Sequence, residues 1–311
     1  VHGGKGICLG PKNYLGRGYQ VVPVAITVEG ANILTRSLMI LGQGAIRCHP
    51  YVLAEMSAAK EKDKQKSLRD FDAALFGHVG YTLSNAARSF VMAATLARFS
   101  DAPDTGTTRR YYQHINKFSA QFAFATDMAM LTLGGYLKQK EHLSARLGDV
   151  LSSLYMASMV LKHYENQGRP EADLPLVEWS CRTLLYKAQE QLHDFLRNFP
   201  NRFIAGAMRL VIFPRGRTYF AASDRLGRAI VEPLMMPSAT RDRLAWGIYR
   251  TVEPGNPIGL LQEALELSVA TEPLSATVLK GKQLFYDARD ARLAREGYMS
   301  CASCHNDGGG D

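Results

Sequence analysis

Apolar residues recur at three- and four-residue spacing along most of the chain, which is the pattern of helices with one buried face. The first such run follows Glu29, where Ile33, Leu34, Leu38 and Leu41 share this spacing. Three residues then interrupt or kink the pattern: Gly42, Gly44 and Pro50. Four long helices are predicted after them, at 68–99, 109–138, about 140–167 and 175–199.

Shorter helices are predicted further along the chain, around 201–211, 224–236, 238–249 and 257–271. Turn signals separate the longer helices, namely D-A-P-D-T-G at 101–106 and N-Q-G-R-P at 166–170. No segment of useful length alternates between apolar and polar residues with a period of two. The pattern therefore predicts an all-α fold, a helical bundle in which helices pack on helices.

The two ends of the chain differ from this helical middle. Residues 1–28 are rich in glycine and carry Pro11 and Pro23, which predicts turns and short irregular segments. A second change of composition falls near 272–280, and we expect a domain boundary there. Because the chain begins with Val1 and stops in a glycine run, we expect it to be a fragment of longer protein sequence.

Composition limits the classes of function. The 311 residues allow one large or two ordinary domains, and the net charge of +8 suits an anionic partner such as a phosphate-bearing cofactor or a membrane surface. The charge forms no basic block, since K-E-K-D-K-Q-K at 60–66 is mixed in sign, so nucleic-acid binding is disfavoured. No apolar run reaches 18 residues, and no secretory signal is visible.

Cysteine usage changes along the chain. Cys8, Cys48 and Cys181 are isolated, as expected of buried thiols in a reducing compartment. Cys301 and Cys304 form a pair that His305 follows directly. The spacing C-x-x-C-H attaches a c-type haem through both thiols, with the histidine on the iron, although zinc and redox-active pairs share part of it.

Two features near the N-terminus suggest chemistry. The glycines of H-G-G-K-G, which are Gly3, Gly4 and Gly6, allow close approach of the backbone to a pyrophosphate, or they form a tight turn. Glu29 stands between an apolar run and an apolar helix, where desolvation would raise the pKa of its carboxyl and suit a general base. The alternative is a carboxylate at a helix N-terminus that interacts with the helix dipole.

The run from His2 to Arg36 resembles the C-terminal catalytic segment of acyl-CoA dehydrogenases. That family carries a G-G-x-G element, an E-G dipeptide that opens a helix, and an arginine seven residues after the glutamate; here these are Gly3-Gly4-Lys5-Gly6, Glu29-Gly30 and Arg36. Three further stretches resemble the large bacterial members of fatty-acid β-oxidation: S-L-M-I-L-G-Q-G-A-I-R-C-H-P-Y-V-L-A-E-M, F-P-R-G-R-T-Y (213–219) and M-P-S-A-T-R-D-R-L-A-W-G-I-Y (236–249). The resemblance covers about 1–272.

The resemblance implies a reaction, a cofactor and partners. Glu29 would remove the α-proton of a fatty acyl-CoA while the β-hydrogen passes as hydride to FAD, giving the trans-2-enoyl-CoA. Gly3, Gly4 and Gly6 would lie near the FAD diphosphate, and Gly30 near the thioester. The intact protein would be a homodimer that passes electrons to a separate acceptor. The family's flavin contacts just after the glutamate cannot be carried over, because Ala31 and Asn32-Ile33 occupy those positions.

The resemblance also divides the chain. Residues 1–56 would end the catalytic helical domain and 57–272 would form the subfamily's helical extension, which packs on the catalytic core or makes a dimer contact. The extension's histidines lack metal-ligand spacing and are read as surface or core residues: His78, His114, His142, His163 and His193. We expect this chain by itself to bind FAD weakly and to turn over no substrate, because the family's other domains are not in it.

The last segment, 275–311, resembles the start of the first haem domain of bacterial di-haem cytochrome c peroxidases, where G-K-x-L-F-(F/Y)-D precedes S-C-A-S-C-H. Cys301 and Cys304 would hold haem c, and His305 would bind its iron; the cytochrome c-like tail is incomplete. Covalent haem implies the periplasm, whereas CoA esters imply the cytoplasm, with the enzyme at the inner membrane face. A chimera joined near 275 is the favoured account, and a true fusion or an idle motif are the others. The competing functions are a haem electron-transfer or peroxidase protein and a non-catalytic helical module.

Overall fold

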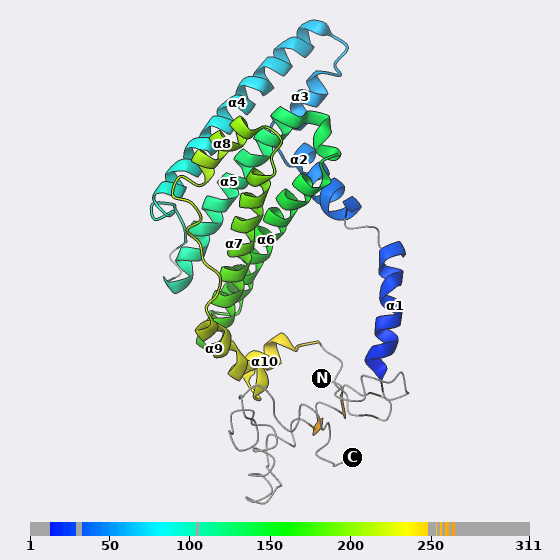
Figure 1. Ribbon diagram of the computed structural model, residues 1–311, viewed down its shortest axis with the longest axis vertical. Helices are drawn as coiled ribbons and strands as arrows, with labels where there is room; N and C mark the ends of the chain where they lie inside the picture. The colour runs from blue at the N-terminus through cyan, green and yellow to red at the C-terminus, as the bar shows by residue number, and fades with distance from the viewer. Residues whose placement is uncertain are drawn as a thin grey trace, which may run out of the picture. The chain divides into compact units, whose positions relative to one another are not determined.

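A computed structural model of the chain describes residues 13–28, 33–103, 106–247, 253, 256, 259–260 and 263–264. These residues hold helices and no strand, so the predicted all-α fold is confirmed for this part of the chain. The structure has two compact units, one of residues 30–235 and one made of the two ends of the chain, 1–29 and 236–311. The helical bundle lies in the first of these units (Figure 1).

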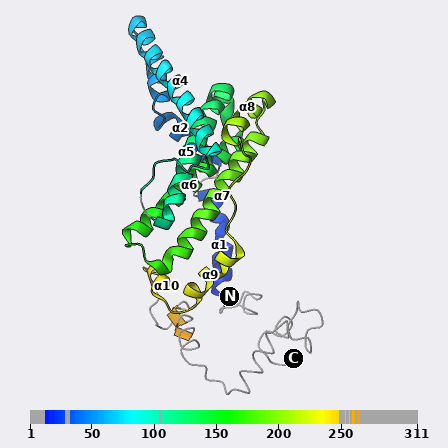
Figure 2. The same ribbon diagram turned by 90° about the vertical axis from the view of Figure 1, so that its left-hand side faces the viewer.

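The bundle is built from antiparallel helices that follow one another along the chain. Its centre is formed by α5 (Arg109–Leu133), α6 (Glu141–Asn166) and α7 (Leu174–Arg197), and α4 (Lys64–Ala94) packs on α5. Next, α8 (Arg202–Ile212) lies against α4 and α7, and α9 (Asp224–Met235) against α7. Short 3-10 turns join them, at Gly106–Thr108, Gly134–Lys138 and Glu171–Asp173. Figures 1 and 2 show that α4 runs past the ends of its neighbours.

One continuous core holds α5, α6 and α7 together. Its fully buried side chains stand at helical spacing on facing sides of these helices, and the largest are Phe118, Leu147, Leu161, Leu185, Leu192 and Phe195. Burying each such side chain contributes roughly 1.5–3 kcal/mol relative to leaving it in water. The hydrophobic pattern therefore fixes which face of each helix turns inward.

Both boundaries of α4 (Lys64–Ala94) lie four or five residues before the predicted 68–99. Asp63 starts α4, because its Oδ1 accepts hydrogen bonds from the N–H groups of Gln65 (3.0 Å) and Lys66 (3.4 Å). The helix ends at Ala94 rather than at the predicted residue 99. Left-handed backbone at Leu96 and Ala97 (φ 54° and 59°) closes the helix end, and the Ala97 N–H donates to the Met92 carbonyl at 2.6 Å.

Before the bundle, the chain forms three short helices. A π-helix, η2 (Ile33–Gln43), packs on α6 and continues into α2 (Gly44–Arg47). Of the predicted interruption or kink, Gly42 and Gly44 make no interruption, but the helix changes from π to α at Gly44. The chain turns at Cys48–Pro50 and enters α3 (Val52–Ala58), which lies beside α4. The segment 33–51 thus reaches the bundle from its α6 side, and we call it the N-terminal strap.

The other unit contributes two described helices, α1 (Tyr14–Val28) and α10 (Ala239–Leu244). The prediction of turns and irregular segments for residues 1–28 is wrong for 14–28. Asn13 Oδ1 accepts a hydrogen bond from the Gly16 N–H at 2.8 Å and caps the first turn. The glycines and Pro23 lower helix propensity by about 1 and 3 kcal/mol, which weakens a helix without forbidding it. Among the described residues, no helix has the length and apolar character that a membrane span requires.

Candidate functional site

Almost every site residue predicted from the sequence lies outside the described residues. This applies to the base and its neighbour, to the glycine cluster and to the haem motif: Glu29, Gly30, Gly3, Gly4, Gly6, Cys301, Cys304 and His305. Arg36, from the same catalytic segment as Glu29, is described, and the structure places it on η2. Arg36 therefore links the sequence motif to the described bundle.

Arg36 joins the N-terminal strap to α6. Its Nη1 lies 3.2 Å from Asp149 Oδ1, and the two side chains are 39% and 20% exposed. The preceding residue of α6 is Gly148, and a Cβ there would stand 3.2 Å from both Arg36 Cγ and the Arg36 carbonyl oxygen. Gly148 thus lets η2 approach α6 closely, and the next residue, Asp149, binds the arginine of η2. Ser37 and Leu41 of η2 are buried.

The turn after α2 places a histidine inside the bundle. His49 precedes Pro50, and its Nδ1 accepts hydrogen bonds from the N–H groups of Tyr51 and Val52, both at 3.2 Å. The imidazole thereby caps the first turn of α3 in the way that a polar side chain commonly does. Because Nδ1 is the acceptor, the proton of the neutral ring is on Nε2. Nε2 donates to Asp127 Oδ1 at 3.0 Å.

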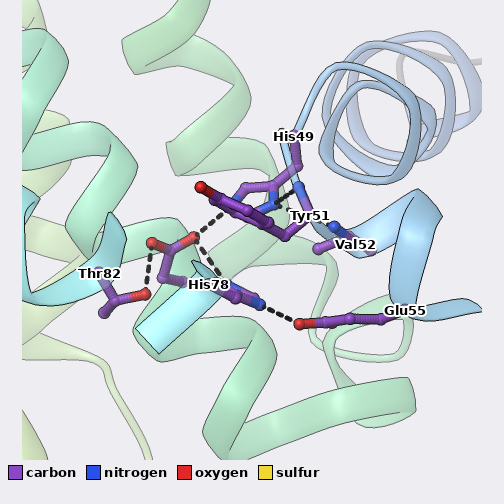
Figure 3. A network of polar contacts seen from close by, with 7 residues as sticks. His49, Tyr51, Val52, Glu55, His78 and Thr82 are labelled. Atoms are coloured by element: carbon purple, nitrogen blue, oxygen red, sulfur yellow. Dashed lines mark hydrogen bonds and ion pairs between the residues drawn. The ribbon is translucent and has the colours of Figure 1, made fainter. Parts of the chain in front are cut away.

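Asp127, on α5, collects contacts from two other elements. Thr82 Oγ1, on α4, donates to its Oδ2 at 3.0 Å. His78 Nε2, also on α4, lies 3.8 Å from Oδ1, and His78 Nδ1 bonds Glu55 of α3 at 2.8 Å. Figure 3 shows His49, Thr82 and His78 converging on this carboxylate, with Glu55 on the outer side of His78. We call His49, Glu55, His78, Thr82 and Asp127 the histidine–aspartate network.

Burial sets the protonation of the network. The side chains of His49 and Asp127 are 8% and 3% exposed. Burial lowers the pKa of His49, an effect that the neighbouring Asp127 carboxylate opposes, and burial raises the pKa of Asp127. The backbone donors at Nδ1 act in the same direction on His49, since they leave no room for a second ring proton. The network thus holds a neutral histidine that donates one hydrogen bond to a carboxylate.

The network has the composition of a metal site but the wrong tautomer. Ligand atoms of His49, His78 and Asp127 all lie within 4.8 Å of one another, and zinc commonly takes histidine and carboxylate ligands. A metal on His49 Nε2 would require a proton on Nδ1, where two backbone N–H groups already point. His49 also has no free nitrogen for general-base chemistry. The network therefore serves to fix the N-terminal strap to α4 and α5.

Tyrosines and a small cavity surround the network. The Tyr51 ring lies against Gly77 of α4, where a Cβ would stand 2.4 Å from a ring carbon, and the Tyr81 ring meets His49 edge-on at 5.2 Å. Beside His49 and Asp127 is a cavity of about 170 Å³, lined mainly by apolar side chains from η2, α2, α5 and α6. Ligand pockets usually measure about 300–1,000 Å³, so this cavity is too small for an acyl-CoA.

A second segment crosses the bundle on another face. Residues 213–223, the C-terminal strap, follow α8 and contain the F-P-R-G-R-T-Y stretch. Gln189 of α7 binds the Tyr219 backbone with two hydrogen bonds of 2.9 Å, and Arg217 Nη1 lies 2.7 Å from Glu190 Oε2. Arg215 Nη1 donates to the Ala94 carbonyl at 3.2 Å. The conspicuous residues of this stretch therefore attach the strap to the bundle.

Beneath the C-terminal strap lies a cluster of basic side chains, of which Lys117 is buried and His114 is half-buried. The His114 ring meets the Tyr219 ring edge-on at 4.9 Å, and its Nε2 lies 3.3 Å from Arg110 Nη2. Burial, followed by the positive charge of Lys117, Arg110 and Arg182, lowers the pKa of His114 to about 3. Burial lowers the pKa of Lys117 to about 8. Burial and neighbouring positive charge thus hold both groups toward their neutral forms.

The sequence did not single out His49, and it read His78 and His114 as surface or core histidines. That reading holds for His114, which is half-buried in the bundle, but it did not connect His78 with His49 and Asp127. The only local signal was the H-P dipeptide at a predicted helix break. Of the cysteines read as buried thiols, Cys181 is buried, whereas Cys48 is exposed and corrects that expectation.

The bundle is an all-α domain, and η2, the helix that leads into it, carries Arg36 of the resemblance motif. Residues 46–293 match the family model for the acyl-CoA dehydrogenase C-terminal domain of bacterial type, and the chain belongs to this family. The match includes the histidine–aspartate network and the C-terminal strap and ends before Cys301. No solved structure matched the chain.

Proposed function

We propose that the protein carrying this sequence oxidises a saturated fatty acyl-CoA to its trans-2-enoyl-CoA in fatty-acid β-oxidation. Glu29 is the base that takes the α-proton, and the developing negative charge on the thioester oxygen is stabilised by hydrogen bonds, one of them from the Glu29 N–H. FAD supplies the acceptor for the β-hydrogen, which leaves as hydride. The family membership of 46–293 supports this class of reaction, and the motif around Glu29 supports the assignment of the base.

The observation that carries the proposal is the ion pair between the catalytic motif, through Arg36, and the domain that matches the family model. Arg36, seven residues after Glu29, pairs with Asp149 of α6, and Gly148 lets η2 lie close to that helix. Both α6 residues fall inside the matched family domain. A general base acts only at a defined distance from its proton, so the helix that follows Glu29 must be held firmly. The bundle provides that hold.

The remaining parts of the proposal rest on the sequence. Gly3, Gly4 and Gly6 approach the FAD diphosphate, and Gly30 approaches the thioester. The enzyme is a cytoplasmic homodimer at the inner membrane face, to which its positive charge of +8 is suited, and it passes electrons to a separate acceptor. Cys301, Cys304 and His305 lie beyond the family match, so haem c, and with it the chimera account, stays a prediction.

Replacing Glu29 tests the proposal in the full-length flavoprotein. Glu29→Gln keeps the size of the side chain and removes the base, and we expect oxidation of a long-chain acyl-CoA to fall by about 10²–10⁴-fold. The flavin should remain bound, as its absorbance spectrum will show. Glu29→Asp, which keeps a carboxylate in a displaced position, should retain more activity than Glu29→Gln. Oxidation at the wild-type rate by Glu29→Gln would overturn the assignment.

A further inference from the structure

The outer side of α8 is a row of uncharged residues. The four residues are exposed and lie at helical spacing on one side of the helix: Phe203, Gly206, Ala207 and Leu210. Phe203 is 91% exposed and Leu210 is 70% exposed, and both project beyond the small residues between them. The buried residues of α8 lie on the other side: Ala205, Met208 and Ile212. Figures 1 and 2 show α8 at the outer edge of the bundle, so the row does not stabilise the core.

The row lies in a stretch of the chain that contains arginine and no acidic residue. Between Asp194 and Asp224 the sequence has five arginines and neither aspartate nor glutamate: Arg197, Arg202, Arg209, Arg215 and Arg217. These 29 residues therefore carry +5 of the net charge of +8. The neighbouring helix adds no negative charge, since α8 lies against α4 and residues 73–94 of α4 contain no aspartate or glutamate. The charge forms no block in the sequence because the arginines are spaced along it.

Most of this positive charge is not neutralised inside the chain. Three arginines donate hydrogen bonds to neutral groups: Arg202 Nη1 to the Arg197 carbonyl at 3.0 Å, Arg209 Nη2 to the His193 ring at 2.9 Å, and Arg215 Nη1 to the Ala94 carbonyl at 3.2 Å. Burial and the nearby arginines lower the pKa of His193, so its ring is neutral at pH 7. Arg217 differs, because it pairs with Glu190. The surface thus presents exposed apolar side chains next to unpaired positive charge.

We infer that α8 and the start of the C-terminal strap bind the surface of an anionic phospholipid bilayer. Phe203 and Leu210 enter the headgroup region, and the guanidinium groups of Arg202, Arg209 and Arg215 lie at the level of the lipid phosphates. The inference rests on the proposed function for the membrane concerned, the inner membrane, whose cytoplasmic leaflet is negatively charged. It adds the surface of the protein that meets this membrane.

The positions of the arginines on α8 favour a bilayer as the partner. Arg202 and Arg209 directly precede Phe203 and Leu210, so each lies about 100° around the helix from an apolar residue of the row. A helix that lies flat in a bilayer surface has this arrangement, because its apolar side enters the headgroup region while long basic side chains reach the phosphates. A projecting phenylalanine can enter a fluid headgroup layer at any point, whereas a protein partner has to present a matching pocket. The uncompensated charge selects an anionic surface.

Flotation with lipid vesicles tests the inference in the full-length flavoprotein. The protein should float with vesicles of equal parts phosphatidylcholine and phosphatidylglycerol, and not with vesicles of phosphatidylcholine alone. Phe203→Glu should weaken the affinity for the anionic vesicles by about tenfold or more, because it removes an inserted side chain and adds a negative charge. Phe76→Glu is the matched control, since Phe76 is 73% exposed on α4 outside this surface and undergoes the same change. Its affinity should stay close to that of the wild type.

The arginines are tested by a second pair of variants. Arg202→Gln combined with Arg209→Gln should weaken the affinity for the anionic vesicles by about tenfold or more, because each basic residue near an anionic surface adds attraction. Lys60→Gln combined with Lys62→Gln removes the same charge from the exposed turn between α3 and α4 and should have a much smaller effect. The unfolding midpoint of Phe203→Glu should match that of the wild type, because the replaced side chain is exposed.

The outcomes separate this inference from the proposed function. A wild-type protein that does not float with the anionic vesicles would overturn the inference and leave the surface to a protein partner. Flotation that Phe203→Glu weakens no more than Phe76→Glu would also overturn it, because the membrane contact would then lie elsewhere in the full-length protein. Oxidation of an acyl-CoA is measured in parallel without vesicles. Activity without flotation contradicts only the membrane surface, and flotation without activity contradicts only the proposed reaction.

Discussion

The two straps cross the same bundle and are attached by similar means. Each has an ion pair to a central helix, Arg36–Asp149 in one and Arg217–Glu190 in the other. Each also involves a half-buried histidine next to a tyrosine ring: His49 lies in the N-terminal strap, and His114 of α5 lies beneath the C-terminal strap. The surroundings of the histidines differ. His49 donates to the Asp127 carboxylate, whereas His114 lies among positively charged side chains.

This difference shows two ways to keep a histidine neutral inside a protein. In the N-terminal strap, backbone N–H groups occupy Nδ1, and the carboxylate accepts the one remaining proton. Beneath the C-terminal strap, burial and nearby positive charge keep the second proton off His114. The hydrogen bond of His49 to Asp127 fixes the position of the N-terminal strap. His114 makes fewer hydrogen bonds, and its lowered pKa makes the free energy of unfolding depend on pH. We therefore expect mutation of the network to destabilise the attachment of the N-terminal strap most, and acid to destabilise the region beneath the C-terminal strap.

The largest effect should come from Asp127→Ala. The substitution leaves the His49 Nε2–H and the Thr82 hydroxyl buried without their acceptor, each at about 1–3 kcal/mol. The free energy of unfolding, measured with denaturant, should fall by about 2–5 kcal/mol. Gln189→Ala, which removes two neutral bonds to Tyr219 of the C-terminal strap, should cost less. If Asp127→Ala costs no more than Gln189→Ala, the carboxylate does not hold the N-terminal strap as described.

Acid should act through His114. Its pKa is about 3 in the folded protein and near 6.5 in the unfolded chain, so the unfolded chain binds more protons between these values and stability falls as the pH falls. The loss approaches about 1.4 kcal/mol per pH unit, or about 2 kcal/mol from pH 6.5 to pH 5. His114→Gln should flatten this part of the stability curve, as denaturation at several pH values will show. If the free energy of unfolding of His114→Gln falls with pH as steeply as that of the wild type, His114 does not cause the loss of stability in acid.

A smaller effect should come from Gly77→Ala. The added Cβ would stand 2.4 Å from the Tyr51 ring, and overpacking costs about 1–3 kcal/mol, from which a gain of about 1 kcal/mol in helix propensity is subtracted. We expect a net loss of about 1 kcal/mol in thermal or denaturant unfolding. Gly80→Ala, three residues further along the same helix, meets nothing within 4 Å and should stabilise the folded chain slightly. Equal effects at both glycines would mean that Tyr51 does not pack on Gly77.

The periodicity of apolar residues predicted the bundle closely. The helix expected at 140–167 spans Glu141–Asn166, and the one expected at 175–199 spans Leu174–Arg197, because a buried stripe constrains every turn of a long helix. The same reasoning failed for α1, where glycines and a proline outweighed the apolar residues in the prediction. The pattern of apolar residues gave no indication that Asn13 caps this helix.

The histidine–aspartate network could not be predicted from the sequence. His49 and Asp127 are 78 residues apart, and no spacing rule relates a turn residue to the middle of a helix. The tautomer of His49 depends on the backbone at Tyr51 and Val52, which only the fold provides. Glu29 is the reverse case, since a local motif identified it and its surroundings lie outside the described residues.

The central claim is that the bundle holds the helix that follows Glu29 through Arg36, and the two ion pairs offer a direct test. Both pairs are partly exposed, so Asp149→Asn and Glu190→Gln should each lower the free energy of unfolding by no more than about 1 kcal/mol. Of Asp149 and Glu190, only Asp149 contacts the N-terminal strap. The measurement is the rate of flavin reduction by a saturated acyl-CoA in the full-length protein. The account predicts that Asp149→Asn slows this rate by about tenfold or more and that Glu190→Gln leaves it unchanged. Equal rates in the two variants would contradict it.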